Sequence, residues 1–321
     1  MDYAEFDEAV DAHRDGLYAG LPIVHAPEPD GDSPRDLPAP EAAAWRIGLD
    51  WGDDEGFEAI FRNFFGTVDT TKVTALIIGN WGDSYESSSR TVVELLIEHA
   101  DRLPALRSLF FGAIPSEESE ISWIQQSDVT PLLAAFPLLE RFEVRGGTAL
   151  EFQAVRHDNL KVLRFETGGM PAAVVRGVSG SEFPALEYLE LWLGTDNYGG
   201  DATVADLEDI LSGERLPALR HLGLQDSEIQ DEVAAAVASA PVVARLESLA
   251  LSLGTLTDEG AEALLTGQPL THLKRLDLHH HYLTDPMIEK VRAAFDGSGV
   301  EVDLSEQEEA DDDWRYVAVA E

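Results

Sequence analysis

Apolar residues recur along this chain in a fixed pattern, L-x-x-L-x-L, in which the first, fourth and sixth positions are leucine or another large apolar residue. Four clear copies begin at Leu186, Leu219, Leu246 and Leu273, and four weaker copies begin at Val73, Leu106, Leu139 and Leu160. The first residues of the eight copies are separated by 33, 33, 21, 26, 33, 27 and 27 residues. Self-similarity at such periods is typical of repeat proteins that stack one supersecondary unit on the next.

Between the copies, apolar residues return at helical spacing, which predicts a helix in most repeats. The predicted helices cover about 55–65, 90–101, 129–136, 171–178, 202–212, 230–239, 257–266 and 284–296. The repeat that begins at Leu139 is 21 residues long and leaves no room for a helix. A strand followed by a helix, repeated with parallel strands, predicts an α/β solenoid with a concave sheet and convex helices.

The segment 249–264 resembles the ribonuclease-inhibitor type of leucine-rich repeat almost residue for residue. The resemblance is strong over 219–285 and loose over 73–218, and it implies a leucine-rich-repeat horseshoe. Gly254, Ser227 and His281 stand where this repeat class often has asparagine, so the loops after the strands are expected to be held differently.

The whole chain also resembles a family of uncharacterised bacterial leucine-rich-repeat proteins, through residues 44–46, 79–83, 126–129, 191–194 and 279–281. Members of that family are encoded beside radical-SAM-like and ATP-grasp-like proteins, so the resemblance implies an accessory role. The resemblance implies no catalytic residue.

Three regions are expected along the chain. Residues 1–43 form an N-terminal extension, with a short acidic helix over 2–15 and a proline-rich strap or cap over 22–40. Residues 44–304 form the solenoid, whose first strand is expected over 44–51. Residues 305–321 form an acidic C-terminal tail, and the alternating pattern of 314–319 leaves open whether it folds back as a cap or stays disordered.

Composition narrows the possible partners. The chain has 61 acidic and 22 basic residues, a net charge of −39, which disfavours nucleic acid and anionic membranes as partners. Only four lysines are present, which favours a solubility or salt adaptation over electrostatic steering of a basic partner. The chain contains no cysteine. We therefore expect a cytoplasmic protein without disulfide caps or thiolate zinc sites.

The third, fifth and seventh positions of each copy are expected on the concave face. The first two strands place small or apolar residues there: Ala75, Ile77, Gly79, Ser108, Phe110 and Gly112. The middle strands place a charged and aromatic set there: Arg141, Glu143, Arg145, Val162, Arg164, Glu166, Tyr188, Glu190 and Trp192. Arginine, tyrosine and tryptophan are enriched in interface hot spots, so this set is predicted to bind a partner. The alternative is a self-satisfied charge lattice, with Arg141–Glu143 and Arg164–Glu166 paired across strands.

The three repeats of 33 residues carry insertions after their strands, and insertions of this kind gather on one face of a solenoid. Each insertion contains aromatic residues, which predicts a binding rim of Trp81, Tyr85, Trp123 and Tyr198. Rings that fill the core of the rim are the alternative. Two glycine pairs, 146–147 and 168–169, are explained more simply by tight turns than by an anion cradle.

Motifs for catalysis are absent from the sequence. The leading prediction is a non-enzymatic scaffold without a cofactor, either monomer or homodimer, that binds a protein or peptide partner on its concave face and aromatic rim. The alternative is a small-molecule-binding or metal-binding accessory protein, with or without enzymatic activity, that uses Asp83, Asp128, Asp277 and His279. In the run of three histidines, strand alternation places His279 on the concave face and His281 inward.

Overall fold

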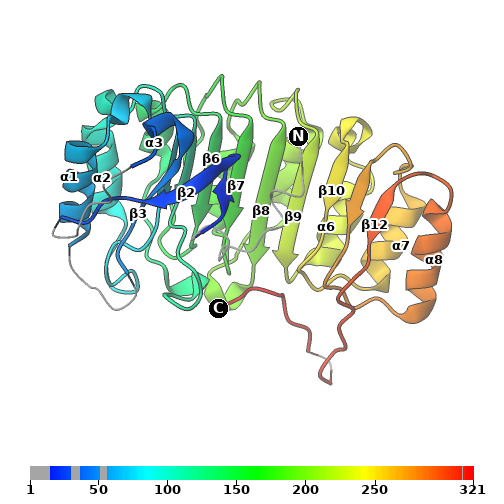
Figure 1. Ribbon diagram of the computed structural model, residues 1–321. Helices are drawn as coiled ribbons and strands as arrows, with labels where there is room; N and C mark the ends of the chain where they lie inside the picture. Colours follow the sequence, from blue (N-terminus) through cyan, green and yellow to red (C-terminus); the bar gives the residue numbers. More distant parts are fainter. Residues whose placement is uncertain (1–14, 30–36, 51–55, 313) are drawn as a thin grey trace. The chain divides into compact units, whose positions relative to one another are not determined.

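The computed structural model describes residues 15–29, 37–50, 56–312 and 314–321, and the chain divides into two compact units, 1–150 and 151–321. Each unit is a run of strands and helices that alternate along the chain (Figure 1). Within the described part, no helix combines the length and apolarity needed to cross a bilayer.

The strands of the first unit lie beside one another in chain order. They are β1 (Leu17–Tyr18), β2 (Leu21–His25), β3 (Ala44–Ile47), β4 (Ala75–Ile78), β5 (Ser108–Phe111) and β6 (Arg141–Arg145). β1 and β2 form an antiparallel hairpin, and from β2 to β6 neighbouring strands are parallel. The helices are α1 (Phe57–Thr67), α2 (Arg90–Glu98) and α3 (Thr130–Ala135), and the 3₁₀ turns are η3 (Pro40–Ala42), η4 (Thr70–Lys72), η5 (Ala100–Arg102) and η6 (Ile121–Trp123).

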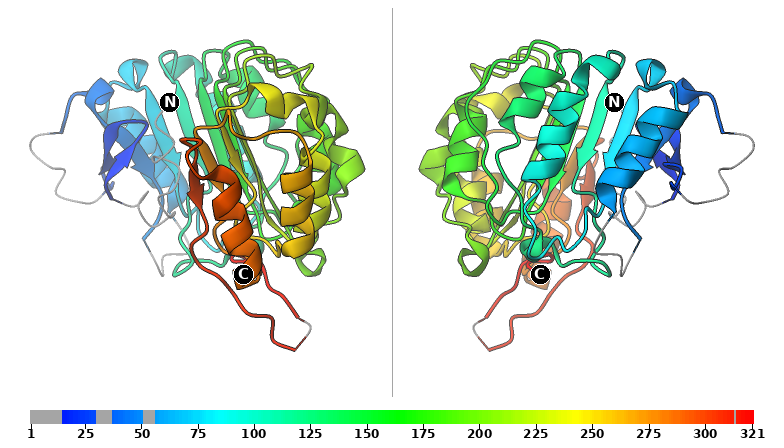
Figure 2. Two further views of the ribbon diagram at one scale, coloured as in Figure 1. Left: turned by 90° about the vertical axis from the view of Figure 1, so that its right-hand side faces the viewer. Right: turned by 90° about the vertical axis from the view of Figure 1, so that its left-hand side faces the viewer.

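In the second unit all neighbouring strands are parallel. They are β7 (Val162–Glu166), β8 (Tyr188–Gly194), β9 (His221–Ser227), β10 (Ser248–Ala250), β11 (Arg275–Asp277) and β12 (Glu301–Asp303). The helices are α4 (Ala172–Ser179), α5 (Glu208–Ser212), α6 (Gln230–Val237), α7 (Asp258–Thr266) and α8 (Asp285–Phe295), with 3₁₀ turns η7 (Asp196–Tyr198), η8 (Val204–Leu207) and η9 (Pro241–Arg245). Helices α7 and α8 lie on one face of this sheet (Figure 2).

The repeat pattern locates these elements closely. Each of the eight predicted strands begins at the third position of its copy, as β4 does at Ala75 and β9 at His221. The leucines at the fourth and sixth positions are buried on the helical side, Leu222 and Leu224 with no exposed surface. The predicted helices are present, and segment 146–161 of the short repeat has none. The mixed α/β arrangement with mostly parallel strands is therefore confirmed.

The N-terminal segment differs from the expected strap, because residues 17–25 form β1 and β2. Ile23 lies opposite Ala44 of β3, so the sheet of the first unit begins before the predicted solenoid. Tyr18 packs on the face without helices, in one cluster with Ile77 and Phe110. The small apolar residues of β4 and β5 thus receive an apolar cover from the same chain. The helix predicted over 2–15 lies outside the described residues except at its last position.

The C-terminal tail lies along the carboxyl ends of the strands in the second unit (Figure 1). Asp226, Leu253 and His280, spaced 27 residues apart, occupy equivalent turns with left-handed φ of 52°, 65° and 53°. The tail crosses these turns in reverse order: the Ala318 amide donates to the Leu253 carbonyl at 2.8 Å, and the Val319 amide to Asp226 Oδ1 at 2.9 Å. Residues 314–321 are therefore a docked, extended segment.

Candidate functional site

The charged and aromatic residues predicted on the concave face form a group around Glu190 in the second unit. This Glu190 group consists of Arg164, Glu166, Tyr188, Glu190 and Trp192. One carboxylate oxygen, Glu190 Oε1, accepts from Arg164 Nε at 2.7 Å and from Trp192 Nε1 at 2.8 Å, and the Tyr188 hydroxyl donates to the other oxygen. Arg164 also pairs with Glu166 at 2.8 Å, and its guanidinium lies 5.5 Å from the Trp192 ring centre.

The Glu190 group is buried on a face where an accessible surface was expected. Arg164 and Glu190 are each 4% exposed, and Trp192 is 8% exposed. Long side chains on adjacent strands cover one another because parallel strands are closely spaced. A charge lattice, the alternative considered, is present, but its two predicted pairs, Arg141–Glu143 and Arg164–Glu166, each lie within one strand and not across strands. The pair that joins two strands is Arg164–Glu190. That a partner binds to this group stays a prediction.

His221 extends the Glu190 group to β9, because its ring stacks on Tyr188 at a centroid distance of 4.0 Å. Burial, together with the charges of Arg275 and Arg164, lowers the pKa of His221 to about 3. The imidazole is therefore neutral at physiological pH. Two nearby arginines repel a protonated imidazole, so they favour the neutral ring.

In the first unit, Arg141, Glu143 and Arg145 on β6 are also buried. Arg141 Nε donates to Glu143 Oε1 at 2.5 Å, along the same strand, and its guanidinium lies 4.8 Å from the Tyr18 ring centre. Arg145 Nε donates to the Ile114 carbonyl at 3.1 Å. The β1–β2 hairpin thus contacts Arg141, a residue predicted to bind an external partner.

The predicted aromatic rim separates into two kinds of ring. Trp81 is buried, stacks on Phe111 at 5.9 Å and donates from Nε1 to the Ser87 carbonyl at 2.9 Å. Tyr198 lies in the second unit and donates its hydroxyl to the Glu321 carboxylate of the docked tail. Tyr85 and Trp123, in contrast, contact each other edge to face at 5.6 Å and are 57% and 45% exposed. We call Tyr85 and Trp123 the rim aromatic pair.

The loops that carry the rim aromatic pair are fixed to each other through the backbone. The Gln125 amide donates to the Ser84 carbonyl at 2.8 Å, and the Ser89 amide donates back to the Gln125 carbonyl at 2.9 Å. The Gln126 side chain then donates to the Arg145 carbonyl at 2.7 Å and ties the second loop to β6. The exposed rings therefore stand on an ordered support.

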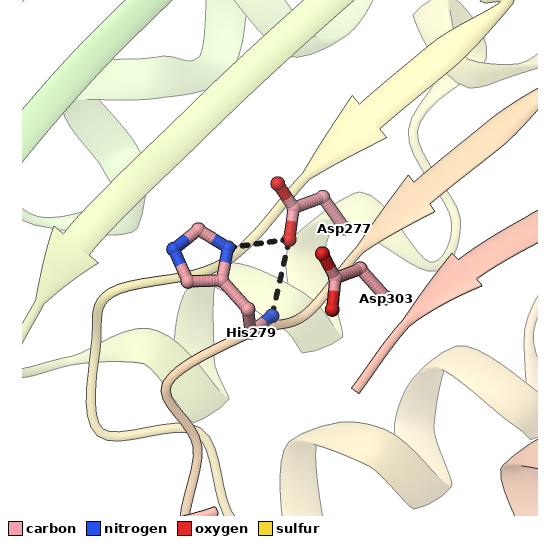
Figure 3. A group of neighbouring side chains, drawn as sticks. All are labelled: Asp277, His279 and Asp303. Atoms are coloured by element: carbon pink, nitrogen blue, oxygen red, sulfur yellow. Dashed lines mark hydrogen bonds and ion pairs between the residues drawn. The ribbon is translucent and has the colours of Figure 1, made fainter. Parts of the chain in front are cut away.

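A third group joins the ends of β11 and β12 in the second unit (Figure 3). Asp277, His279 and Asp303 can each offer one ligand atom, and these atoms lie within 4.8 Å of one another. His279 Nδ1 lies 2.7 Å from Asp277 Oδ1. Burial pulls the pKa of His279 down, but the hydrogen bond to Asp277 and the nearby carboxylate charges outweigh it, so the pKa lies above its usual value.

The sequence pattern predicted two members of this third group, Asp277 and His279, but not Asp303. Asp303 lies directly opposite Asp277 in the parallel register, 26 residues later in the chain. The repeat spacing, continued past the last leucine signature, was the signal that could have found it. The other two aspartates of the predicted metal set, Asp83 and Asp128, lie in the first unit and accept from the backbone amides of Glu86 and Thr130 in local turns.

The histidine run follows the predicted alternation. His281 is fully buried and lies 3.3 Å from the Leu304 carbonyl through Nε2, whereas His279 is on the opposite face. The glycine pair 168–169 is explained by close packing. A Cβ on Gly169 would lie 2.4 Å from the Tyr198 backbone, so a larger residue would force the two loops apart.

Comparison with known proteins supports the fold and assigns no activity. No protein-family model matches the chain, and no curated protein is significantly similar to it. A crystal structure of a protein from Bacteroides fragilis, determined as a Northeast Structural Genomics Consortium target, is similar with a TM-score of 0.76 and 29% sequence identity. The similarity covers 86% of this chain and 76% of the Bacteroides chain.

Proposed function

We propose that this chain is a non-enzymatic, cytoplasmic interaction protein built from leucine-rich repeats of the ribonuclease-inhibitor type. Its partner is a protein or peptide that docks on the rim aromatic pair. The observation that carries the proposal is the exposure of Tyr85 and Trp123 in mutual contact on hydrogen-bonded loops.

The rim aromatic pair has the properties of an interface hot spot. Tyrosine and tryptophan bury large areas with few rotatable bonds, and burial on an ordered support costs little additional entropy. The loop that carries Tyr85 is also fixed by Trp81, which stacks on Phe111 and donates to the Ser87 carbonyl. A partner would gain apolar contact there without first displacing part of this chain.

The chemistry around the rim aromatic pair favours a basic side chain on the partner. Asp83 and Glu86 flank Tyr85 in the sequence and are exposed. A lysine or arginine side chain can lie over an aromatic face and pair with a nearby carboxylate at the same time. The net charge of −39 adds a long-range attraction for such a partner. Although lysine scarcity favours a solubility role for the overall charge, the local placement of Asp83 and Glu86 supports recognition at this site.

The proposal is tested by affinity capture from a native lysate, at low and moderate salt, with wild type and the double variant Tyr85→Ala/Trp123→Ala. Because both rings are exposed, the variant should keep its melting temperature and lose the partner. Trp314→Ala is the matched control, since Trp314 is a 71% exposed tryptophan in the C-terminal tail. Titration of the captured and purified partner should then show at least about 30-fold weaker binding to the double variant.

A partner that binds wild type, Trp314→Ala and the double variant equally would overturn the rim proposal. If such a partner were instead lost on Arg145→Glu/Trp192→Ala, the binding surface would be the face without helices. That second variant must be compared at matched folded fraction, because Arg145 and Trp192 are both buried.

A further inference from the structure

The carboxyl ends of β11 and β12 bring one histidine and two aspartates together. Asp277 and Asp303 are paired in the parallel register, and His279 follows Asp277 by two residues on the same side (Figure 3). Neighbouring in-register carboxylates repel each other unless a positive charge lies between or beside them. The fold therefore holds a concentrated negative charge at this place.

We propose that Asp277, His279 and Asp303 form a binding site for a divalent transition-metal ion of the Zn²⁺ or Mn²⁺ class. This inference is independent of the rim proposal, since the residues involved lie in the second unit and Tyr85 and Trp123 lie in the first. Two carboxylates and one imidazole, without a thiolate, are a donor set that suits these ions.

The donors are held in place by hydrogen bonds, and His279 Nδ1 and Asp277 Oδ1 also bond each other at 2.7 Å, so a bound ion would replace the proton that they share. Asp303 Oδ1 accepts from the Ser305 amide at 3.0 Å and from the Ser305 hydroxyl at 2.7 Å, which fixes the rotation of the carboxylate. Asp277 Oδ1 accepts from the His279 amide at 3.1 Å. Such outer bonds orient metal ligands in known sites.

The separations between the donor atoms of this group are close to those around a bound ion. Ligand bonds of about 2.0–2.2 Å place the donor atoms of one ion about 3–4 Å apart, and the three donor atoms here lie within 4.8 Å of one another. Side-chain rotations within the staggered wells can bring the donor atoms closer. His279 is 24% exposed at its side chain, so an ion can enter and water can complete its coordination.

Arg275 is the positive group that an ion would displace. Its Nη2 lies 3.4 Å from Asp277 Oδ2, a longer contact than the buried Arg164–Glu190 pair at 2.7 Å. Glu306 adds a further negative charge that acts on His279. With His279 neutral, the two carboxylates of Asp277 and Asp303 exceed the single charge of Arg275, and this excess attracts a divalent cation.

The test uses the full chain after treatment with a chelator. Zn²⁺ is titrated by calorimetry, and Mn²⁺ by the loss of the free-ion electron paramagnetic resonance signal, both in about 0.15 M salt to screen general attraction. We expect one ion per chain, bound at least about 10-fold more weakly by His279→Gln and by Asp303→Asn. Glu289→Gln, which removes an exposed carboxylate on α8, should bind like wild type.

Thermal melts of each variant establish that the fold is kept before affinities are compared. Weak binding of several ions, equal in wild type and all three variants, would show counter-ion attraction to the acidic surface and overturn the site. No saturable binding by folded wild type would overturn it as well. Failure here would leave the rim proposal unaffected.

Discussion

At the scale of single residues, the buried charges of the second unit are organised by Glu190. Its carboxylate accepts from an arginine, a tryptophan and a tyrosine, so three donors depend on one side chain. Removing one member of a buried ion pair leaves the other charged and desolvated, which costs more than the pair itself contributes.

Glu190→Gln should therefore lower the free energy of unfolding by about 3–5 kcal/mol, as expected for a broken buried pair. Urea denaturation at pH 7 measures this loss. Glu182→Gln removes an exposed carboxylate paired with Arg156, and should change stability by less than about 1 kcal/mol. Equal losses for the two variants would mean that Glu190 is not the centre of the network.

The lowered pKa of His221 predicts how the free energy of unfolding depends on pH. Its pKa is lowered to about 3 in the folded chain, by burial first and by Arg275 and Arg164 next, against about 6.5 in the unfolded chain. Below pH 6.5 the imidazole is therefore protonated in the unfolded chain but stays neutral in the folded chain. The free energy of unfolding falls as the pH drops from about 6.5 toward 3. The expected contribution is about 1.4 kcal/mol per pH unit.

The measurement is urea unfolding at pH 7, 6 and 5 for wild type and His221→Gln. Between pH 6 and 5 wild type should lose about 1.4 kcal/mol more than the variant. Carboxylates that titrate in the same range act equally on both proteins and cancel in the difference. Parallel pH curves would show that His221 is not buried as a neutral ring.

At the scale of secondary-structure elements, the C-terminal tail is held by backbone contacts to successive repeats. The amides of Ala318 and Val319 each donate to one of the left-handed turns. The side chain of Val317, the residue before them, is buried. These contacts attach the tail to the turns of two successive repeats.

Val317→Asp should release the tail, because a charge would replace the buried apolar contact. Hydrogen–deuterium exchange should show faster exchange at the amides of Ala318 and Val319, with the sheet of the second unit still protected. Trp314→Ala, at an exposed tail position, should leave both amides protected. Unchanged protection in Val317→Asp would contradict a docked tail.

At the scale of the whole molecule, the leucine periodicity predicts the fold because each repeat buries its leucines against helices. It located β9 and α6, and the length of the short repeat explained why 146–161 lacks a helix. Periodicity could not tell which residues cover the opposite face. Tyr18, far from β5 in sequence, packs on Phe110, and the Glu190 group buries itself through contacts between strands.

In the candidate sites, too, the sequence pattern did not show which side chains are covered by others. Composition and insertion length pointed to Tyr85 and Trp123, but the sequence offered no way to separate them from the buried Trp81. Asp303 was missed because it lies beyond the last leucine signature and joins Asp277 only through strand register. Local pattern thus predicts the elements, and tertiary contact decides which side chains stay accessible.

The central claim, that the rim aromatic pair binds the partner, is tested most directly by hydrogen–deuterium exchange of this chain with and without its captured partner. We expect new protection in the loops 81–89 and 121–127, and no such change when the partner is mixed with Tyr85→Ala/Trp123→Ala. Protection confined to other segments, with both loops exchanging as in the free chain, would contradict it.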